Sequence, residues 1–360
     1  MTTMRTALRL RGLLEVLRHV HAAPAVTRAG LARELGLSRS SATEIVGRLR
    51  ALALVEETEA APTGERGRPT TVLGPHPEGP VVAAFEITQG TWKSAVAGLG
   101  GEQERVTERP HGRVDALDLV AERLGELAAE LGPRLRAAGV AVPGTLSGGR
   151  VVQAVHLGWD VVDVAAELGA SVPVVVRNDA TLAGVAEARR GAARDRAAAL
   201  HLTAVDVGIG GVLIDGGSPV AGGTGAGGEF GHLPFGDPAA ACPCGASGCW
   251  ELEVNAAALA GRGPAAVARS LGRGIGGLVN ALDPTAVTLS GLAADLLGSD
   301  RETVEEAYAA ALMSYRRAAP PPLLAARFPY DGPLRGAAEL AYDTVLSEAG
   351  LTSWQAARGG

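Results

Sequence analysis

The chain has 360 residues, of which 47% are hydrophobic and 20% charged, with a formal net charge of −6. This length is enough for two or three domains, and the composition is that of a folded chain rather than a disordered one. No apolar run approaches the about 18 residues of a membrane-spanning helix, and arginines interrupt the N-terminal segment, which lacks the apolar core of a signal peptide. We therefore expect a cytoplasmic protein with no membrane partner.

The N-terminal part of the chain has the opposite charge to the rest. Residues 1–77 contain 11 arginines against 7 glutamates, whereas the remainder is acidic. This distribution predicts that only a basic head meets a polyanion. Apolar spacing predicts helices over 5–21, from Thr27 and over 38–52, with Thr27 and Ser38 as N-caps and a turn at Gly36.

This order of helices is typical of helix-turn-helix DNA-binding domains. The helix after Ser38 begins with short polar and basic side chains, which let its backbone approach the major groove. Two short strands follow Leu54 and flank an Arg-Gly-Arg-Pro tip suited to phosphates or a minor groove. A plain three-helix bundle with solvated arginines is the alternative. The candidate DNA-binding residues are Ser38, Arg39, Ser40, Ser41, Thr43, Arg66 and Arg68.

Residues 75–80 are typical of a linker, so a winged helix-turn-helix domain over 1–77 precedes a body over 81–360. Strands and helices alternate in the body, which predicts α/β layers in two halves with a ligand cleft between them. The expected strands are 81–87, 94–99, 139–144, 173–179, 198–205, 210–217 and 286–291, and the expected helices are 117–138, 272–284 and 301–318.

All three cysteines lie in the segment "CPCGASGCWE", residues 242–251. Their odd number and the expected location argue against disulfides, and the redox Cys-x-x-Cys spacing is absent. Structural zinc takes four Cys or His ligands, so three thiolates leave one position open. His232 is the nearest upstream histidine and would complete a Cys3His site. Three buried thiols without a ligand are the alternative.

The motif "GEFGH…CPCGASGCWE" resembles the signature of the ROK family (repressors, open reading frames and sugar kinases). The segments "GVAVPG", "RNDATLAGVAEARRG", "VGIGGVLIDG" and "LVNALDPTAVTLSGLA" follow in the family's order, so the resemblance covers nearly the whole chain. It implies an actin-like ATPase fold of two ribonuclease-H-like lobes, behind a head like that of the family's regulators. It also implies structural zinc on His232, Cys242, Cys244 and Cys249.

The resemblance further implies a sugar pocket. Clustered carboxylates and an amide can bind several hydroxyls at once, and a metal-bound imidazole is held in a fixed orientation. Asp179 occupies the place of the kinases' general base, but we expect it to be vestigial here. The simpler explanation for Asn178 and Asp179 is a capped turn at the end of a strand. For Glu229 and Glu251 it is a solvated position on the surface. The implied sugar-binding residues are Asn178, Asp179, Glu229, His232 and Glu251.

Both phosphate-binding turns depart from the kinase pattern. In the first, Glu86 replaces an aspartate, and Thr88 and Gln89 replace glycines whose bare N–H groups cradle phosphate. In the second, the acidic Asp206 and Val207 replace a Gly-Thr pair. We therefore expect no kinase activity and no catalytic residue, and a DNA-binding regulator of carbohydrate metabolism, as a repressor.

The segment around 262–270 is shorter than usual in the family, and the asparagine expected before Gly158-Trp159 is missing. The expected regulator is a homodimer or homotetramer that binds operator DNA and responds to a sugar or sugar phosphate. A sugar kinase with an added DNA-binding head, a repressor that needs no ligand, and a metal sensor remain alternatives.

Overall fold

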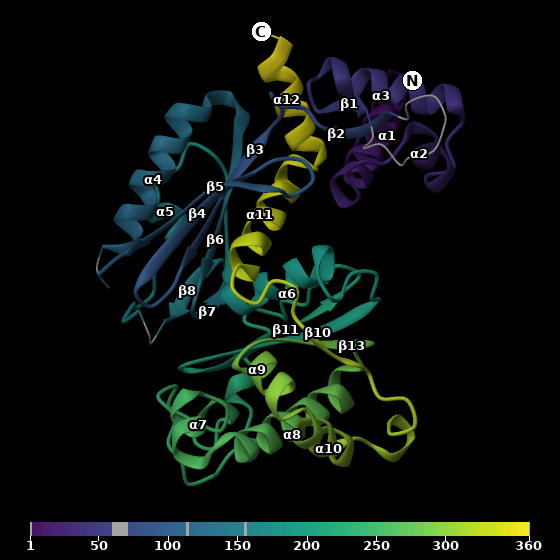
Figure 1. Ribbon diagram of the computed structural model, residues 1–360. Coiled ribbons are helices and arrows are strands. Elements are labelled where there is room, and N and C mark those ends of the chain that lie inside the picture. Colours follow the sequence, from purple (N-terminus) through teal and green to yellow (C-terminus); the bar gives the residue numbers. More distant parts are fainter. Residues whose placement is uncertain (1, 60–70, 113–114, 155–156, 360) are drawn as a thin grey trace.

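The computed structural model describes residues 2–59, 71–112, 115–154 and 157–359 (Figure 1). A winged head is followed by two α/β lobes, and the two chain ends lie at the same end of the molecule (Figure 1). The head consists of α1 (Thr2–Ala22), α2 (Arg28–Glu34), α3 (Arg39–Ala51) and the antiparallel strands β1 (Val55–Glu59) and β2 (Thr71–Pro75).

The predicted caps of the head helices are confirmed. The Thr27 side chain accepts a hydrogen bond from the backbone N–H of Gly30, and the Ser38 side chain accepts one from that of Ser41. These bonds satisfy N–H groups that have no partner within the first turn of a helix. Gly36 makes the intervening turn with a positive φ of 62°.

The first lobe contains a five-stranded sheet in the order β5-β4-β3-β6-β9. Strands β3, β4 and β5 are antiparallel, and β3, β6 and β9 are parallel. Its elements are β3 (Val81–Ile87), β4 (Thr91–Ala97), β5 (Gln103–Pro110), α4 (Ala116–Leu131), η1 (Gly132–Arg134), β6 (Leu135–Val142), β7 (Thr145–Ser147), β8 (Arg150–Gln153), α5 (Val164–Glu167), β9 (Val174–Asn178) and α6 (Asp179–Arg190).

The second lobe repeats this topology in the order β12-β11-β10-β13-β14, with the same change from antiparallel to parallel pairing. It contains β10 (Ala198–Val205), β11 (Gly208–Asp215), β12 (Ser218–Pro219), η2 (Phe230–His232), η3 (Trp250–Leu252), α7 (Ala256–Arg262), α8 (Pro264–Leu282), β13 (Ala286–Gly291), α9 (Leu292–Ser299), α10 (Arg301–Ala311), η4 (Ser314–Arg316) and β14 (Leu323–Ala325). The short segment near 262–270 is the junction of α7 and α8 at Gly263, and the core of this lobe is continuous across it.

Two of the predicted helices end earlier in the structure than expected. The helix expected over 117–138 ends at Leu131, because Gly132 takes a positive φ of 53° and Pro133 follows; the residues beyond form β6. The helix expected over 301–318 ends at Ala311. Asn280 bonds the C=O of Ala311 and the N–H of Met313 there, and so replaces the next helical turn.

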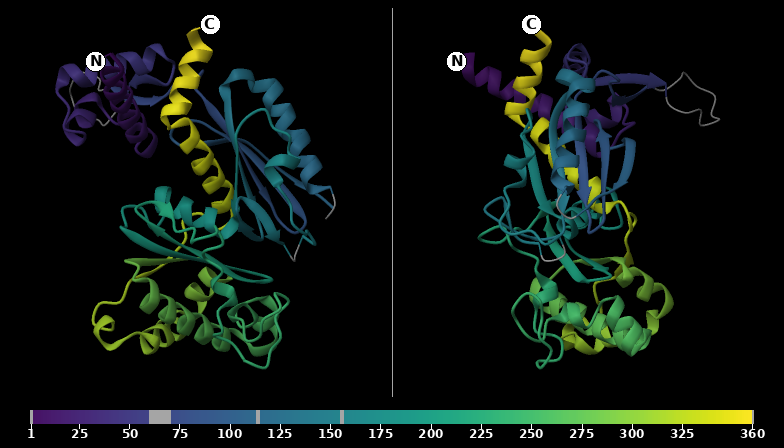
Figure 2. Two further views of the ribbon diagram at one scale, coloured as in Figure 1. Left: turned by 180° about the vertical axis from the view of Figure 1, so that it is seen from behind. Right: turned by 90° about the vertical axis from the view of Figure 1, so that its left-hand side faces the viewer.

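The last two helices, α11 (Gly332–Val345) and α12 (Glu348–Gly359), join the first lobe to the head. Helix α11 contacts α6 and strands β3 and β6, while α6 also contacts β10 and β11 of the second lobe. Figures 1 and 2 show α6 between the lobes, α11 running from α6 along the first lobe, and α12 beside the head. Apolar residues of the head, including Leu17 and Leu49, share one core with Val82, Tyr342 and Trp354 of the body. The head and the first lobe therefore pack as one unit.

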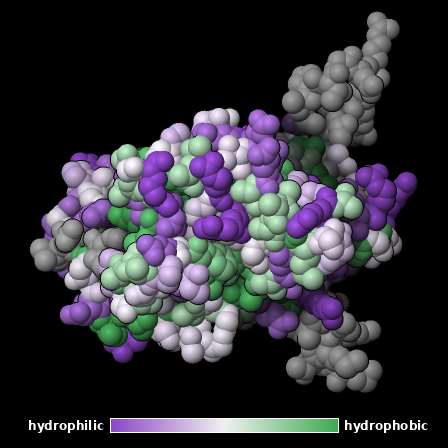
Figure 3. Space-filling view, turned by 90° about the horizontal axis from the view of Figure 1, so that it is seen from below, coloured by the Kyte–Doolittle hydropathy of each residue, from purple (hydrophilic) through white to green (hydrophobic). Residues whose placement is uncertain are grey.

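The surface of the second lobe is mixed in character. Seen from the side of α7, α8 and α10, hydrophilic and hydrophobic residues alternate over the exposed face (Figure 3). Among the helices of the described residues, none is both long and apolar enough to cross a membrane.

Candidate functional site

A cavity of about 200 Å³ lies where the two lobes meet, and it contains all five sugar-binding candidates. The β9–α6 junction contributes Asn178 and Asp179. In the second lobe, η2 and the residue before it contribute His232 and Glu229, and η3 contributes Glu251. The lobes therefore face each other across a small polar space.

Asn178 and Asp179 lie where β9 ends and α6 begins. Asn178 is the N-cap of α6: its side-chain oxygen accepts from the N–H of Thr181 (3.1 Å) and its amide donates to the C=O of Gly144 (3.1 Å). The Asp179 carboxylate accepts from the N–H of Ala180 (2.8 Å). Burial raises the pKa of Asp179 to about 6; backbone hydrogen bonds oppose this rise and the charge of Glu229 adds to it. Asp179 can therefore exchange a proton near neutral pH.

Glu229 and His232 lie on a turn packed flat against β11. Gly228 has a φ of 101°, and a side chain there would overlap the backbone of Gly211. A side chain at Gly231 would likewise overlap the backbone of Ile209. Only glycines allow this approach, which brings the His232 Nε2 within 3.9 Å of the Glu229 carboxylate.

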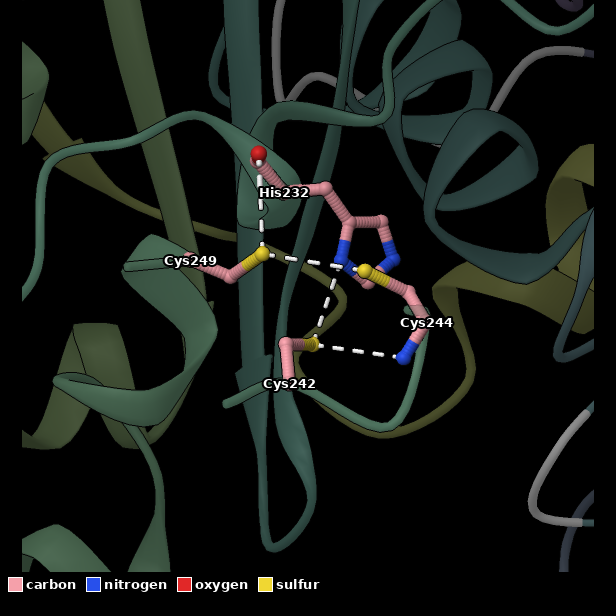
Figure 4. A group of neighbouring side chains, drawn as sticks. All are labelled: His232, Cys242, Cys244 and Cys249. Atoms are coloured by element: carbon pink, nitrogen blue, oxygen red, sulfur yellow. Dashed lines mark hydrogen bonds between the residues drawn. The ribbon is translucent and has the colours of Figure 1, made fainter. Parts of the chain in front are cut away.

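The predicted metal ligands are gathered in one place. The donor atoms of His232, Cys242, Cys244 and Cys249 all lie within 4.8 Å of one another, and the four side chains point toward a common centre (Figure 4). The Sγ atoms of Cys244 and Cys249 are 3.7 Å apart. A tetrahedral zinc ion with Zn–S bonds of about 2.3 Å separates its sulfurs by about 3.8 Å. The donor set and its spacing therefore fit a tetrahedral metal ion such as zinc.

The imidazole of His232 faces both the metal cluster and the pocket. Its Nδ1 lies 3.9 Å from the Cys242 Sγ, so Nδ1 is the nitrogen placed to bind a metal while Nε2 faces Glu229. Burial raises the pKa of Cys242 and of Cys249, whereas a hydrogen bond from the Ala246 N–H lowers that of Cys244. A bound cation would favour the thiolate form of all three.

Glu251 connects the metal cluster to the pocket. It follows Cys249 and the fully buried Trp250, whose indole N–H donates to the C=O of Ser270 (3.2 Å). The Cys242 thiol donates to the Glu251 carboxylate (2.9 Å), and that carboxylate lies 3.5 Å from the His232 Nδ1. The anchored tryptophan thus fixes the backbone that presents Glu251.

The β3–β4 and β10–β11 turns correspond to the turns that hold phosphate in kinases. In the β3–β4 turn, Thr88 and Thr91 bond each other through their hydroxyls and backbone groups (2.8–3.1 Å). At the β10–β11 turn, Val205, Asp206 and Val207 form an exposed tip. The N–H group of Thr88 is therefore bonded within the first turn, and the acidic Asp206 is exposed at the second.

The DNA-binding candidates fall into two groups. Ser38, Arg39, Ser40 and Thr43 are exposed and Ser41 is partly exposed, all on the first turns of α3. The Ser38 hydroxyl contacts those of Ser40 and Ser41, and the Thr43 hydroxyl donates to the C=O of Arg39. Among these residues, Arg39 therefore has the longest side chain that extends from the helix. Arg66 and Arg68 lie outside the described residues.

Sequence reasoning missed two polar residues of the cavity, Thr145 and Gln153. They belong to the β7–β8 hairpin, which is joined by Gly148 and Gly149, both with positive φ. A Gly-Gly pair between short strands is a hairpin signal that would have found this element.

Two lobes of this topology around a polar cleft define an actin-like ATPase fold of the sugar-kinase type, and the head is a winged helix. The ROK family profile matches residues 86–265, and the MarR family profile matches residues 14–67. The chain belongs to the ROK family, with a MarR-type winged helix at its N-terminal end.

Known structures and curated sequences give the same fold and family. A ROK family transcriptional regulator, a homologue of the E. coli MLC protein, matches with a TM-score of 0.75 at 21% identity, over 96% of this chain and 99% of that one. The Thermus thermophilus ROK hexokinase matches at 0.61 and 29% identity, over 74% and 99%.

Curated sequences similar to this chain include glucokinases. Those of Halalkalibacterium halodurans and Streptomyces coelicolor are 32% and 30% identical over 127 and 154 residues, or 34% and 42% of this chain. The matches span only 38% and 47% of those proteins.

Proposed function

We propose that this protein is a DNA-binding transcriptional regulator, acting as a repressor of carbohydrate metabolism, whose body senses a sugar and does not phosphorylate it. The observation that carries the proposal is the core shared by the winged head and the sugar-kinase-like body, in which Leu17 and Leu49 pack with Tyr342 and Trp354. A head packed in this way responds to changes in the body, which a head on a free linker does not. The proposed domains are 1–77 and 81–360.

The proposed sugar-binding residues are the five side chains of the cleft. Asp179, Glu229 and Glu251 offer acceptors to hydroxyls, Asn178 offers an amide, and His232 Nε2 offers an N–H donor when Nδ1 binds the metal. The described lining of the cavity contains neither arginine nor lysine. Three carboxylates without a cation repel a phosphate, so we propose an unphosphorylated sugar as the effector.

A structural zinc ion on His232, Cys242, Cys244 and Cys249 is part of the proposal. The thiolate and imidazole donors and the 3.7 Å sulfur separation support it. When bound, the ion supplies a fixed centre for the surrounding loop. The chain's own residues do the sensing: the loop holds Glu251 and His232 against the sugar space, and their orientation decides which hydroxyls are bonded.

The closed β3–β4 turn and the acidic β10–β11 tip support the absence of phosphoryl transfer. Two observations favour the alternative of a sugar kinase with a DNA-binding head. Asp179 lies in the cavity with a pKa near 6, which suits a general base, and the curated relatives are glucokinases.

The proposed mechanism requires two heads, because operators recognised by helix-turn-helix proteins are paired half-sites. We therefore propose a homodimer or homotetramer, in the compartment that holds the chromosome, the cytoplasm. Sugar bound between the lobes changes their closure and with it the position of each head.

The test is duplex selection from a random DNA pool with the purified full chain, followed by affinity measurements on the selected duplex. Glucose, mannose, N-acetylglucosamine and glucose 6-phosphate are added in turn, and phosphoryl transfer from ATP is followed in parallel. We expect a selected palindrome, weaker binding with one neutral sugar, and no transfer. Failure to select any duplex rejects the regulator, and transfer to a sugar establishes the kinase. Operator binding that no sugar alters favours a ligand-independent repressor, and DNA release at physiological free zinc favours a metal sensor.

A further inference from the structure

Helix α6 has one end in the candidate sugar pocket and the other at the contact between head and body. Its first residue is Asp179 and its last is Arg190, a span of 12 residues and about 18 Å at 1.5 Å per residue. Figure 1 shows α6 beside α11, between the first lobe and the second. One secondary-structure element thus reaches both functional regions.

The last turn of α6 is bonded to the last turn of α1 in the head. Arg190 donates through Nη1 to the backbone C=O of His21 (2.7 Å) and through Nε to the Glu339 carboxylate of α11 (2.8 Å). Arg194, just beyond α6, donates to the C=O of Ala22 (3.2 Å). We call His21, Arg190 and Glu339 the seam cluster, since they join the head, α6 and α11.

The hydrogen bonds of His21 fix its role in the seam cluster. The backbone N–H of Gly100 donates to Nδ1 (3.0 Å), so Nδ1 is the acceptor. Nε2 therefore carries the proton and donates to the Glu339 carboxylate (3.3 Å). The ring also stacks on Tyr342 of α11, with centroids 4.7 Å apart and planes 3° from parallel. A neutral imidazole satisfies every one of these contacts.

Glu339 is the residue on which the seam cluster depends. Its side chain is only 4% exposed, and it lies between His21 and Arg190. Burial alone would raise its pKa, but the hydrogen bond from His21 and the charge and hydrogen bond of Arg190 lower the pKa to about 2. Arg189 Nη1 lies farther away, 3.7 Å from the carboxylate, so the loss of His21 or Arg190 leaves the buried charge less well compensated. The head is therefore held in one position while the cluster is intact.

Helices α6 and α11 are packed too closely to slide past each other. A side chain at Gly336 of α11 would overlap the backbone of Leu182 of α6, and one at Gly332 of α11 would press against Ala183 of α6. Contacts between backbones through glycines leave no soft side chains to absorb a displacement. A shift at the Asp179 end of α6 is therefore carried to the Arg190 end.

We propose that α6 and the seam cluster transmit sugar binding at Asp179 to the orientation of the DNA-binding head, with Glu339 and Arg190 as positioning residues. This proposal rests on the proposed function, because it concerns the regulation of the same pocket. Sugar that draws Asp179 toward Glu229 and His232 tilts α6, and the seam cluster converts the tilt into movement of α1. Coupling of this kind is reciprocal, so bound DNA changes sugar affinity by the same factor.

The test measures the effect of sugar on operator affinity in Glu339→Gln, with glucose, mannose and N-acetylglucosamine as probes. Glutamine keeps the shape but removes the charge that binds His21 and Arg190. We expect the sugar-induced change in operator affinity to fall at least about 5-fold, while the sugar Kd of the free protein changes less than about 2-fold. Glu305→Gln, in an exposed pair with Arg301 on α10, is the matched control and should behave as the original chain.

Two further measurements keep the outcomes distinct. If Glu339→Gln does not fold, Arg190→Lys, which keeps the charge but not the forked geometry, replaces it. Hydrogen exchange of peptides covering 17–22 and Gly100 should rise with sugar in the original chain and not in the variant. If a folded variant of the seam cluster shows the same sugar effect on operator affinity as the original chain, this inference is wrong but the proposed function still stands. If no sugar changes the operator affinity of the original chain, both this inference and the proposed sugar sensing are wrong.

Discussion

Glu86 and Lys93 lie directly opposite each other on β3 and β4, with their charged groups 3.5 Å apart. Lys93 is the only lysine of the chain, and its ammonium also donates to the C=O of Tyr330 (3.3 Å). Burial raises the pKa of Glu86 to about 7, although Lys93 lowers it, and the charge of Asp179 contributes to the rise. Next to the turn where kinases bind phosphate, this chain thus has an internal ion pair.

We predict that Lys93→Met destabilises the protein in a pH-dependent way. Glu86 has a raised pKa, so its protonated form is favoured in the fold, and the associated stability is lost as pH rises through 7. Above pH 7 we expect the Lys93→Met variant to be less stable than the original chain by about 1–3 kcal/mol. At pH 5 the difference in stability should be close to zero. Urea unfolding at pH 5 and 8.5 measures it.

The double variant Glu86→Gln with Lys93→Met is the control for this prediction, since it removes the charge as well as its partner. It should recover most of the lost stability at pH 8.5. Equal destabilisation at both pH values would mean that the packing of Lys93, and not its charge, is what matters.

Asp179→Asn is expected to stabilise the fold while it abolishes sugar binding. The pKa of Asp179 is raised to about 6, so the native state resists its ionisation and loses stability as pH rises through 6. Asparagine mimics the neutral acid, and the variant should be more stable by about 1–3 kcal/mol at pH 8 but similar at pH 4. The exposed Asp295→Asn should change neither property. Denaturant unfolding and titration calorimetry with glucose provide both readouts.

Local features of the head and of the metal cluster could be predicted from the sequence. Thr27 and Ser38 cap the helices as expected, because capping depends on neighbours three residues away. His232 meets the three cysteines because the connecting segment is short and rich in turn residues. The helix that ends at Leu131 was misjudged because its apolar spacing continues into β6.

Long-range pairings could not be predicted from one sequence. His21 and Glu339 are 318 residues apart, and no local pattern indicates that they meet. Strand β5 was missed because most of its residues are exposed, so it shows no alternation of polar and apolar residues. It is an edge strand rich in charge, which keeps it from pairing with other chains.

Cys249→Ser should remove the metal and weaken the whole second lobe. Cys249 is fully buried next to Trp250, so a loose cluster also frees the backbone that presents Glu251. We expect about one zinc per chain in the original protein by elemental analysis, and a thermal midpoint lower by roughly 5 °C or more in the variant. Ser247→Ala changes an exposed hydroxyl of the same loop and should leave both values unaltered. Full zinc content in Cys249→Ser would show that the ion binds elsewhere.

Glucose should bind at least about 10-fold more tightly than glucose 6-phosphate. The cavity presents Asp179, Glu229 and Glu251, with neither arginine nor lysine in its described lining, so the carboxylates repel a phosphate. Glu229→Gln should reduce the difference in affinity between glucose and glucose 6-phosphate, since it removes one of the three carboxylates. Titration calorimetry at low salt gives both affinities, and preferential binding of the phosphate would require a cation from outside this lining.

Arg39→Ala is expected to weaken operator binding about 10-fold without changing stability. Arg39 lies exposed on the first turn of α3, where its guanidinium can reach a phosphate or a guanine. Loss of a phosphate contact weakens all duplexes alike and lowers the slope of log affinity against log salt by about 1, whereas loss of a base contact relaxes the sequence preference at one position. Binding of the selected duplex and of single-base variants at several salt concentrations separates these roles. Arg301→Ala, on the distant α10, is the matched control, and equal losses in both variants would mean that general charge and not α3 holds the DNA.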